Sequence, residues 1–270
     1  MEPVPTLEPA QVLLLAAAAL VAGAVNAVAG GGSLLSFPAL LAVGYPALTA
    51  NVTNSVALTP GYFGGTLGYR RELAGQRGRI LALGATSTVG AVVGAALLLV
   101  SSAALFERIV PWLIFLACGL LAAQPRLARL VRGERRAGSG GRRDPAGRTG
   151  LDGHTAALFA AQFLAAVYGA YFGAGVGIMM LAILGIFVAD TLQRLNALKG
   201  LLSLLVAVVA ALAFALLADV GWVAVGVMAA ASLIGGQLGV VLARRLNDRV
   251  LRWLVIAFGA AVGVRLLLAG

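Results

Sequence analysis

Long apolar runs with few internal charges are the feature that most limits the folds open to this chain. Of its 270 residues, 61% are hydrophobic and 11% are charged, whereas a soluble domain usually carries about 25% charged residues. A soluble core could not bury this much apolar surface, so lipid must solvate a large part of it. We therefore expect an all-α, polytopic transmembrane helix bundle. Its apolar runs are 10–29, 33–44, 47–69, 80–100, 105–123, 155–172, 176–189, 196–218, 220–243 and 250–269.

Eight of these runs are long enough to cross a hydrocarbon core, which takes about 20 helical residues. The runs 33–44 and 176–189 are too short, and each follows a glycine-rich break. We therefore expect about eight spanning helices, and two short helices that begin at the breaks. The breaks read Gly30-Gly31-Gly32-Ser33 and Gly173-Ala174-Gly175-Val176-Gly177.

The two halves of the chain repeat one order of elements: a helix, a glycine break, a short helix and three spans. Equivalent residues are 145 positions apart. With a further gap of four residues, Trp112 falls on Trp253. The matches predict two transmembrane repeats, at 1–123 and 154–270, joined by the segment 124–153. Without a gap, the offset places Gly30 on Gly175, Gly32 on Gly177, Asn51 on Asn196, Gly90 on Gly235 and Gly94 on Gly239.

Basic residues predict which connections face the cytoplasm, because positive charge concentrates there. The joining segment 124–153 holds eight arginines around a Gly-Ser-Gly-Gly stretch. We expect a flexible cytoplasmic linker there, and contact with anionic lipid is the alternative to a simple topology signal. Basic residues also mark the connections near 70–79, 194–199 and 244–252, whereas those near 44–47, 101–104 and 219–221 have none.

This charge pattern gives the two halves opposite orientations. We assume that each broken helix pair enters the membrane and returns to the side on which it began. Three spans then follow in each half, and because three is an odd number the second half begins on the opposite side from the first. Both termini then lie outside. Inverted repeats with broken helices are a recurring plan of secondary transporters. Arg265, close to the C-terminus, fits this topology poorly. The first ten residues contain no Lys or Arg, so we expect no cleavable signal peptide.

The glycine breaks are candidate binding elements for an anion. Irregular backbone at membrane depth survives only where protein packs around it or where it lines a cavity. A helix N-terminus offers unpaired N–H groups and partial positive charge, and Ser33 is placed to cap the first short helix. Two such turns facing one another near the midplane would suit a small oxyanion. The alternative is that the glycines only permit tight helix crossing.

Lys199 is the only lysine in the chain and lies near the start of a long apolar run. A lysine in a membrane helix is costly and therefore a candidate functional residue. We expect it to supply positive charge to the substrate, with hydrogen bonds from Asn196, Asn51 and Asn54. The alternative is that Lys199 snorkels to the cytoplasmic interface as a topology anchor.

A polar cluster that includes Asn51, Asn54 and Ser55 lies inside another apolar run. Residues three or four apart share a helix face, and polar side chains at lipid depth usually face the bundle interior. The cluster therefore either binds substrate or forms hydrogen bonds between helices. Pro60-Gly61 follows it and would permit a kink.

The residue types that are absent from the apolar runs limit the kinds of transport that the chain could perform. The carboxylates lie at termini, loops or span ends, whereas proton relays usually need one inside the membrane. We therefore expect gradient-driven anion movement or coupling through the substrate's own proton. One cysteine, one histidine and the lack of a phosphate-binding loop give no reason to expect a cofactor, a metal or ATP-driven transport. Arginines confined to short loops also argue against nucleic-acid binding.

Four segments resemble the sulfite exporter TauE/SafE family. They are Asn26–Ser33 with Pro38 after it, Ala50–Ser55, Gly173–Gly177 and Leu195–Lys199. This resemblance implies transport of small anions such as sulfite, sulfonates and related organosulfur compounds.

We therefore expect a secondary transporter or facilitator in the bacterial inner membrane, with a small inorganic or organosulfur anion and membrane lipid as partners. One alternative is a membrane scaffold or assembly subunit without transport, which glycine turns packed together without a cavity would favour. An intramembrane enzyme is disfavoured because the chain offers no deep carboxylate and one histidine at an interface. The particular anion, the direction of transport and the existence of a homo-oligomer stay open.

Overall fold

A computed structural model describes residues 7–28, 30–137, 154–242 and 248–269, and its secondary structure there is helical, as expected. The elements are α1 (Pro9–Val28), α2 (Ser33–Ala42), α3 (Ala47–Gly68), α4 (Arg77–Val100), α5 (Ala103–Ala137), α6 (His154–Tyr171), α7 (Val176–Phe187), α8 (Leu192–Leu217), α9 (Trp222–Leu242) and α10 (Asp248–Ala269).

The two short helices form where the glycine breaks predict them. α2 begins at Ser33, the last residue of the first break, and α7 begins at Val176, within the second break. Both helices lie within the predicted runs 33–44 and 176–189 and end two residues before them. The expectation that Ser33 caps α2 is wrong, because Ser33 is the first helical residue and Gly32 occupies the N-cap position. No side chain caps α2, and the Leu34 and Leu35 N–H groups bond to the Gly31 and Gly32 carbonyl oxygens. Asn26 instead holds the break before the helix, since its Oδ1 atom accepts a hydrogen bond from the Gly32 N–H at 2.8 Å.

α5 is longer than its apolar run. It continues to Ala137, into the arginine-rich segment that we expected to be a flexible linker. Leucine, alanine, arginine and glutamine are good helix formers, so charge alone does not end the helix here. The rest of the predicted linker, 138–153, lies outside the described residues.

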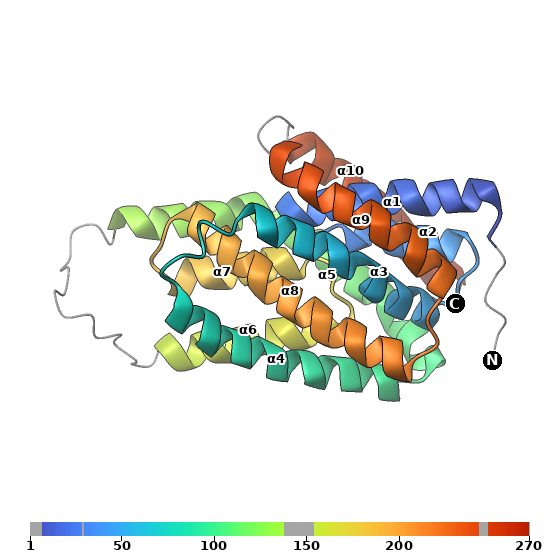
Figure 1. Cartoon of the computed structure of the whole chain (residues 1–270), viewed down its shortest axis with the longest axis horizontal. Helices are drawn as coiled ribbons and strands as arrows, with labels where there is room; N and C mark the ends of the chain where they lie inside the picture. The colour runs from blue at the N-terminus through green and yellow to red at the C-terminus, as the bar shows by residue number, and fades with distance from the viewer. Residues whose placement is uncertain (1–6, 29, 138–153, 243–247, 270) are drawn as a thin grey trace.

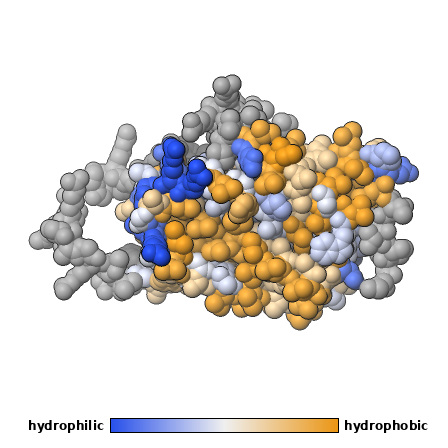
Figure 2. All heavy atoms as spheres, viewed as in Figure 1, coloured by the Kyte–Doolittle hydropathy of each residue, from blue (hydrophilic) through white to orange (hydrophobic). Residues whose placement is uncertain are grey.

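The surface of the bundle is that of a multi-pass membrane protein. By length and composition, five described helical segments could cross a membrane: Pro9–Ala27, Arg77–Val100, Ala103–Ala123, Leu192–Leu217 and Trp222–Gly239. Large apolar side chains point outward along them, and Figure 2 shows hydrophobic residues covering most of the visible face. The expected number of about eight spans remains a prediction.

Helices from the two halves interlock along the long axis of the molecule (Figure 1). α1 packs along α9, α3 packs along α8 and α9, and α4 packs along α6 and α8. The start of α1 and the end of α10 lie at the same end of the bundle. The α3–α4 and α7–α8 connections lie at the other end. Neither half therefore forms a separate bundle.

Matching glycines make these contacts between the halves close. A Cβ atom on Gly94 of α4 would lie 2.2 Å from the Val167 carbonyl oxygen of α6. A Cβ atom on Gly235 of α9 would lie 2.0 Å from the Leu20 carbonyl oxygen of α1. Each half thus uses glycine to approach the first helix of the other half, as small residues do in membrane interfaces. This supports the internal repeat, while its inverted orientation stays a prediction.

Replacing Gly235 by valine should destabilise the bundle, because α1 backbone occupies the space that the new side chain needs. We expect a loss of at least about 1–3 kcal/mol, the usual cost of an overpacked core. The measurement is the melting temperature of the detergent-purified protein. Gly226→Ala is the control, since no atom lies within 4 Å of that added Cβ. Equal melting temperatures for Gly235→Val and the wild-type protein would contradict this packing.

Candidate substrate site

The two glycine breaks meet in direct backbone contact. A Cβ atom built on Gly30 would lie 2.6 Å from the Gly177 Cα atom, and one built on Gly177 would lie 2.9 Å from the Gly30 Cα atom. Gly30 also has a φ angle of 85°, which disfavours any side chain there. The turns therefore face one another, as expected, but leave no room for an anion between them. Here the glycines permit a tight crossing.

Other glycines of the breaks face different neighbours. An added Cβ on Gly31 would lie 2.6 Å from the Leu121 side chain of α5, and one on Gly175 would lie 3.5 Å from the Ala117 backbone of the same helix. One on Gly32 would lie 2.1 Å from the Ala22 carbonyl oxygen of α1. These three glycines pack helices and do not line the cavities described next.

Lys199 lies beside the crossing, inside the protein. Its side chain is only 3% exposed, and its Cδ and Cε atoms would lie 3.7 Å from a Cβ atom on Gly177. The two salt bridges found among the described residues do not involve it. The buried position is not that of a lysine snorkelling to the interface. The structure instead places a lysine without a described counter-ion beside the contact of the two glycine breaks.

A cavity of about 10 Å³ adjoins Lys199, which is close to the smallest volume that holds one water molecule. Asn26 and Asn196 line it together with Tyr62 and Thr66. The Nδ2 atom of Asn26 and the Oδ1 atom of Asn196 are buried without a hydrogen-bond partner. The lining of this cavity thus offers donors from Lys199 and Asn26 and one acceptor without a partner, the Oδ1 atom of Asn196.

A second cavity, of about 30 Å³, lies next to the first between α3 and α8. Asn54, Ser55 and Ser203 contribute polar groups to its lining, and the Oδ1 atom of Asn54 has no hydrogen-bond partner. Ser33 also lines this cavity. The 145-residue offset pairs Asn54 with Lys199, so equivalent positions of the two halves line different cavities.

The two cavities follow one another along the same helix pair. The second is lined by α3 residues 54–62 and α8 residues 203–210, and the Lys199 cavity by α3 residues 62–66 and α8 residues 196–200. Tyr62 lines both cavities. Its ring is therefore the shared wall between two small polar spaces.

The remaining predicted residue, Asn51, joins the two halves. Its Nδ2 atom donates a hydrogen bond to the Tyr171 carbonyl oxygen at 2.9 Å, at the end of α6. Ser55 donates to the Asn51 carbonyl oxygen at 2.9 Å within α3, although Ser55 also lines the second cavity. For Asn51 the observed contact is thus the alternative role, a hydrogen bond between helices.

Asn26 and Tyr62 were not predicted as site residues. Asn26 is a polar residue just before a glycine break, and that signal was present in the sequence. Tyr62 lies among apolar and glycine residues, so only the packing of α3 on α8 reveals its position between the cavities.

A cluster of charged residues links α4, α8 and the α3–α4 connection near the start of α8. Asp190 binds Arg79 of α4 at 2.6 Å and Arg194 of α8 at 2.9 Å. Arg194 also donates to the Ala74 carbonyl oxygen at 3.0 Å. Partial burial acts to raise the pKa of Asp190, but hydrogen bonds from the Thr191 backbone and the two arginines outweigh it and lower that pKa. This ion cluster ties the α3–α4 connection to α8, one turn before Lys199.

Comparison with known proteins identifies the family. A model of the sulfite exporter TauE/SafE family matches residues 15–266. The chain belongs to this family. Together with its long apolar helices, this membership makes the chain a multi-pass membrane protein.

One relative is also named as a membrane transporter. The chain is 30% identical over 110 residues to the "Probable membrane transporter protein ORF9" of Sinorhizobium sp. The match covers 41% of this chain and 42% of that protein, so it spans less than half of either. No solved structure matches the chain.

Asp190→Asn should weaken the ion cluster. Because its folded-state pKa is lowered, the carboxylate of Asp190 stabilises the fold above its unfolded pKa of about 4. That stability is lost as the pH falls through the lower folded value. We expect Asp190→Asn to cost no more than about 1 kcal/mol at pH 7, since the partners are partly exposed. Melting temperatures at pH 7 and pH 3 test this. A deficit of equal size at both values would contradict the ionic origin.

Proposed function

We propose that this TauE/SafE protein is a secondary transporter or facilitator for small anions of the sulfite and sulfonate type in the bacterial inner membrane. The observation that carries the proposal is Lys199, a buried cation that has no described counter-ion and lines the smaller of the two cavities. A charge at membrane depth is costly unless it is paired. An anionic substrate would supply the missing partner.

The donors around Lys199 favour an oxyanion. The ammonium has three N–H donors, and Asn26 adds an unpaired amide donor from the end of α1. Oxygen atoms on one sulfur centre could accept hydrogen bonds from both groups at once. No described carboxylate lines either small cavity, so the lining adds no negative charge that would repel an anion.

The path for this anion runs between α3 and α8. The Lys199 cavity lies toward the end with the arginine-rich α3–α4 connection, and the Asn54 cavity lies further along both helices. Each is far smaller than the 300–1,000 Å³ typical of sites for larger ligands. The structure therefore supports a closed state, from which α3 and α8 must separate to admit substrate. The Pro60-Gly61 pair next to Tyr62 lacks one backbone donor and provides a place for α3 to bend.

The alternative function is a membrane scaffold. A scaffold would have glycine turns packed together without a cavity between them, and Gly30 and Gly177 are packed in this way. A scaffold, however, has no use for a buried lysine that forms no salt bridge with any described residue, where an apolar side chain would be less costly. Membership of a transporter family also opposes this alternative.

The energy source that we propose is the gradient of the anion itself, or the substrate's own proton. Neither small cavity is lined by a described aspartate, glutamate or histidine, the usual carriers in a proton relay.

Lys199→Met should abolish most anion transport while the protein still inserts and purifies normally. Loss of charge-assisted hydrogen bonds of about 1.5–3 kcal/mol corresponds to a ten- to hundredfold weaker interaction. The measurement is uptake of radiolabelled sulfite, sulfate or a small sulfonate into proteoliposomes. Lys199→Arg should retain part of the activity because it keeps the charge.

Ser87→Ala is the matched control, because it removes a buried hydrogen bond to Gln162 away from both cavities. It should leave uptake near the wild-type rate. Unchanged uptake by a normally inserted Lys199→Met protein would reject the proposed role of this lysine.

Tyr62→Ala should join the two cavities and relax selection by size. We expect uptake of a bulky sulfonate to rise relative to sulfite by at least about threefold, because the shared wall is removed. Tyr62→Phe should keep the ratio near that of the wild-type protein, since the ring remains. A ratio unaffected by Tyr62→Ala would show that this ring does not lie on the transport path.

A further inference from the structure

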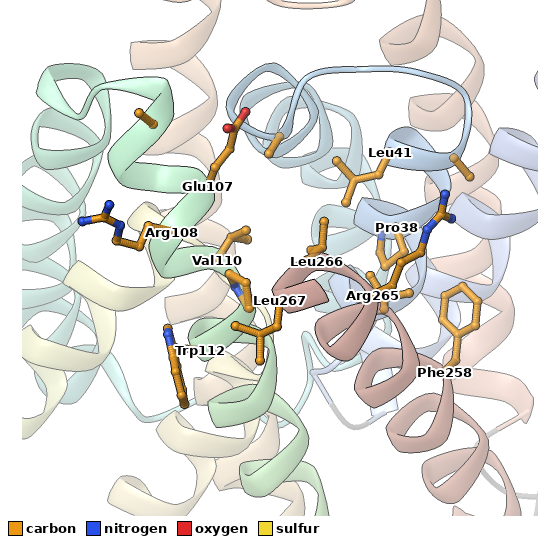
Figure 3. Close-up of a pocket in the computed structure, with 15 residues that line it drawn as sticks. Pro38, Leu41, Glu107, Arg108, Val110, Trp112, Phe258, Arg265, Leu266 and Leu267 are labelled. Carbon is orange, nitrogen blue, oxygen red and sulfur yellow. The ribbon is translucent and has the colours of Figure 1, made fainter. Parts of the chain in front are cut away.

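A cavity much larger than those beside Lys199 and Asn54 lies away from the proposed transport path. It has a volume of about 780 Å³ and is formed by the ends of α2 and α10 and the starts of α3 and α5 (Figure 3). None of its lining residues lines the Lys199 or the Asn54 cavity. It lies at the end of the bundle opposite the arginine-rich α3–α4 connection, since α4 separates that connection from the start of α5.

The middle of this cavity is apolar and its edge is charged. In Figure 3, Val110, Leu266 and Leu267 lie between the helices at its centre. Arg108 and Arg265 extend to opposite sides and point away from one another. A single free inorganic anion held between the two guanidinium groups is therefore a poor match for the space.

The charge of the lining favours a negative ligand. Two arginines and one carboxylate, Glu107, leave one net positive charge around the cavity. Neither arginine takes part in the salt bridges found within the described ranges. Arginine matches phosphate well because its planar fork donates two parallel hydrogen bonds.

The helices around the cavity face lipid. Trp112, which lines it, is 63% exposed, and tryptophan concentrates at the membrane–water interface. Leu105 and Leu116 of α5, together with Val264 and Leu268 of α10, are also exposed. The cavity therefore adjoins the region where headgroups meet acyl chains.

We propose that this cavity binds an anionic phospholipid. An acyl chain covers Leu266 and Leu267, because water would otherwise wet their apolar surface at a cost. The lipid phosphate pairs with Arg265 or Arg108 at the edge. This explains why an arginine lies near the C-terminus on the side that the loop charges predict to be outside. Arg265 acts as a lipid ligand there and not as a topology signal.

The test is lipid binding by the full, delipidated protein in detergent, measured by native mass spectrometry. Phosphatidylglycerol should bind at least about tenfold more tightly than phosphatidylcholine or phosphatidylethanolamine. Arg108→Gln combined with Arg265→Gln should remove that preference. Arg71→Gln is the control, because Arg71 lies in the exposed α3–α4 connection at the opposite end.

Leu267→Trp provides a second variant that keeps both arginines but fills the apolar centre. It should reduce phosphatidylglycerol binding by a similar factor, even if the double arginine variant does not fold. Lys199→Met should bind phosphatidylglycerol as the wild-type protein does, which separates this site from the proposed transport site.

Three results would overturn the proposal. The first is equal affinity for phosphatidylglycerol and phosphatidylcholine. The second is unchanged binding by the folded arginine variant and by Leu267→Trp. The third is inorganic phosphate competing at the same concentration as the lipid, since the acyl chain would then contribute nothing.

Discussion

The hydrocarbon core of a membrane offers no hydrogen-bond partners, and this constraint shapes the centre of the protein. Two chain breaks at membrane depth free backbone groups that must be satisfied inside the protein. Asn26 satisfies the Gly32 N–H, and Tyr168 donates to the Ala174 carbonyl oxygen at 2.6 Å in the other break. Gly30 and Gly177 then bring the two breaks into contact. The helices that surround this crossing form the small polar cavities.

The contact between the two breaks is also what buries Lys199. Its stem lies along the glycine crossing, which excludes water and leaves no described counter-ion nearby. The same tight contact that satisfies the breaks therefore keeps a positive charge in a low-dielectric space. In the proposed function, an anion that enters would be stabilised by this charge, and the cavities of about 10 and 30 Å³ would have to widen to hold it. Binding and opening are thus linked by the size of the cavities.

Much of the fold follows from the sequence, because hydropathy and glycine breaks act locally. The helical class and the short helices α2 and α7 could be predicted in this way, and Lys199 was notable as the only lysine. The end of α5 was not predicted, because an arginine-rich segment can continue a helix as readily as form a loop. Nor was the start of α2, because Ser33 was the nearest acceptor in sequence but Asn26 is the side chain that accepts from the break, at the Gly32 N–H.

The site itself depends on which helices are neighbours. Asn51 and Asn54 lie one turn apart on α3, yet Asn51 bonds to the end of α6 whereas Asn54 lines a cavity. Sequence spacing places both on one face but does not say what that face meets. Tyr62 likewise acquires its position only through the contact of α3 with α8.

Counterflow in liposomes that contain the purified protein tests the central claim most directly. Vesicles loaded with unlabelled sulfite, sulfate or a small sulfonate are diluted into the radiolabelled anion, without any imposed ion gradient. The account predicts transient, saturable accumulation of at least one labelled anion, with competition by anions of the same class. No accumulation of any of these anions above that of protein-free vesicles, with folded and correctly inserted protein, would contradict it.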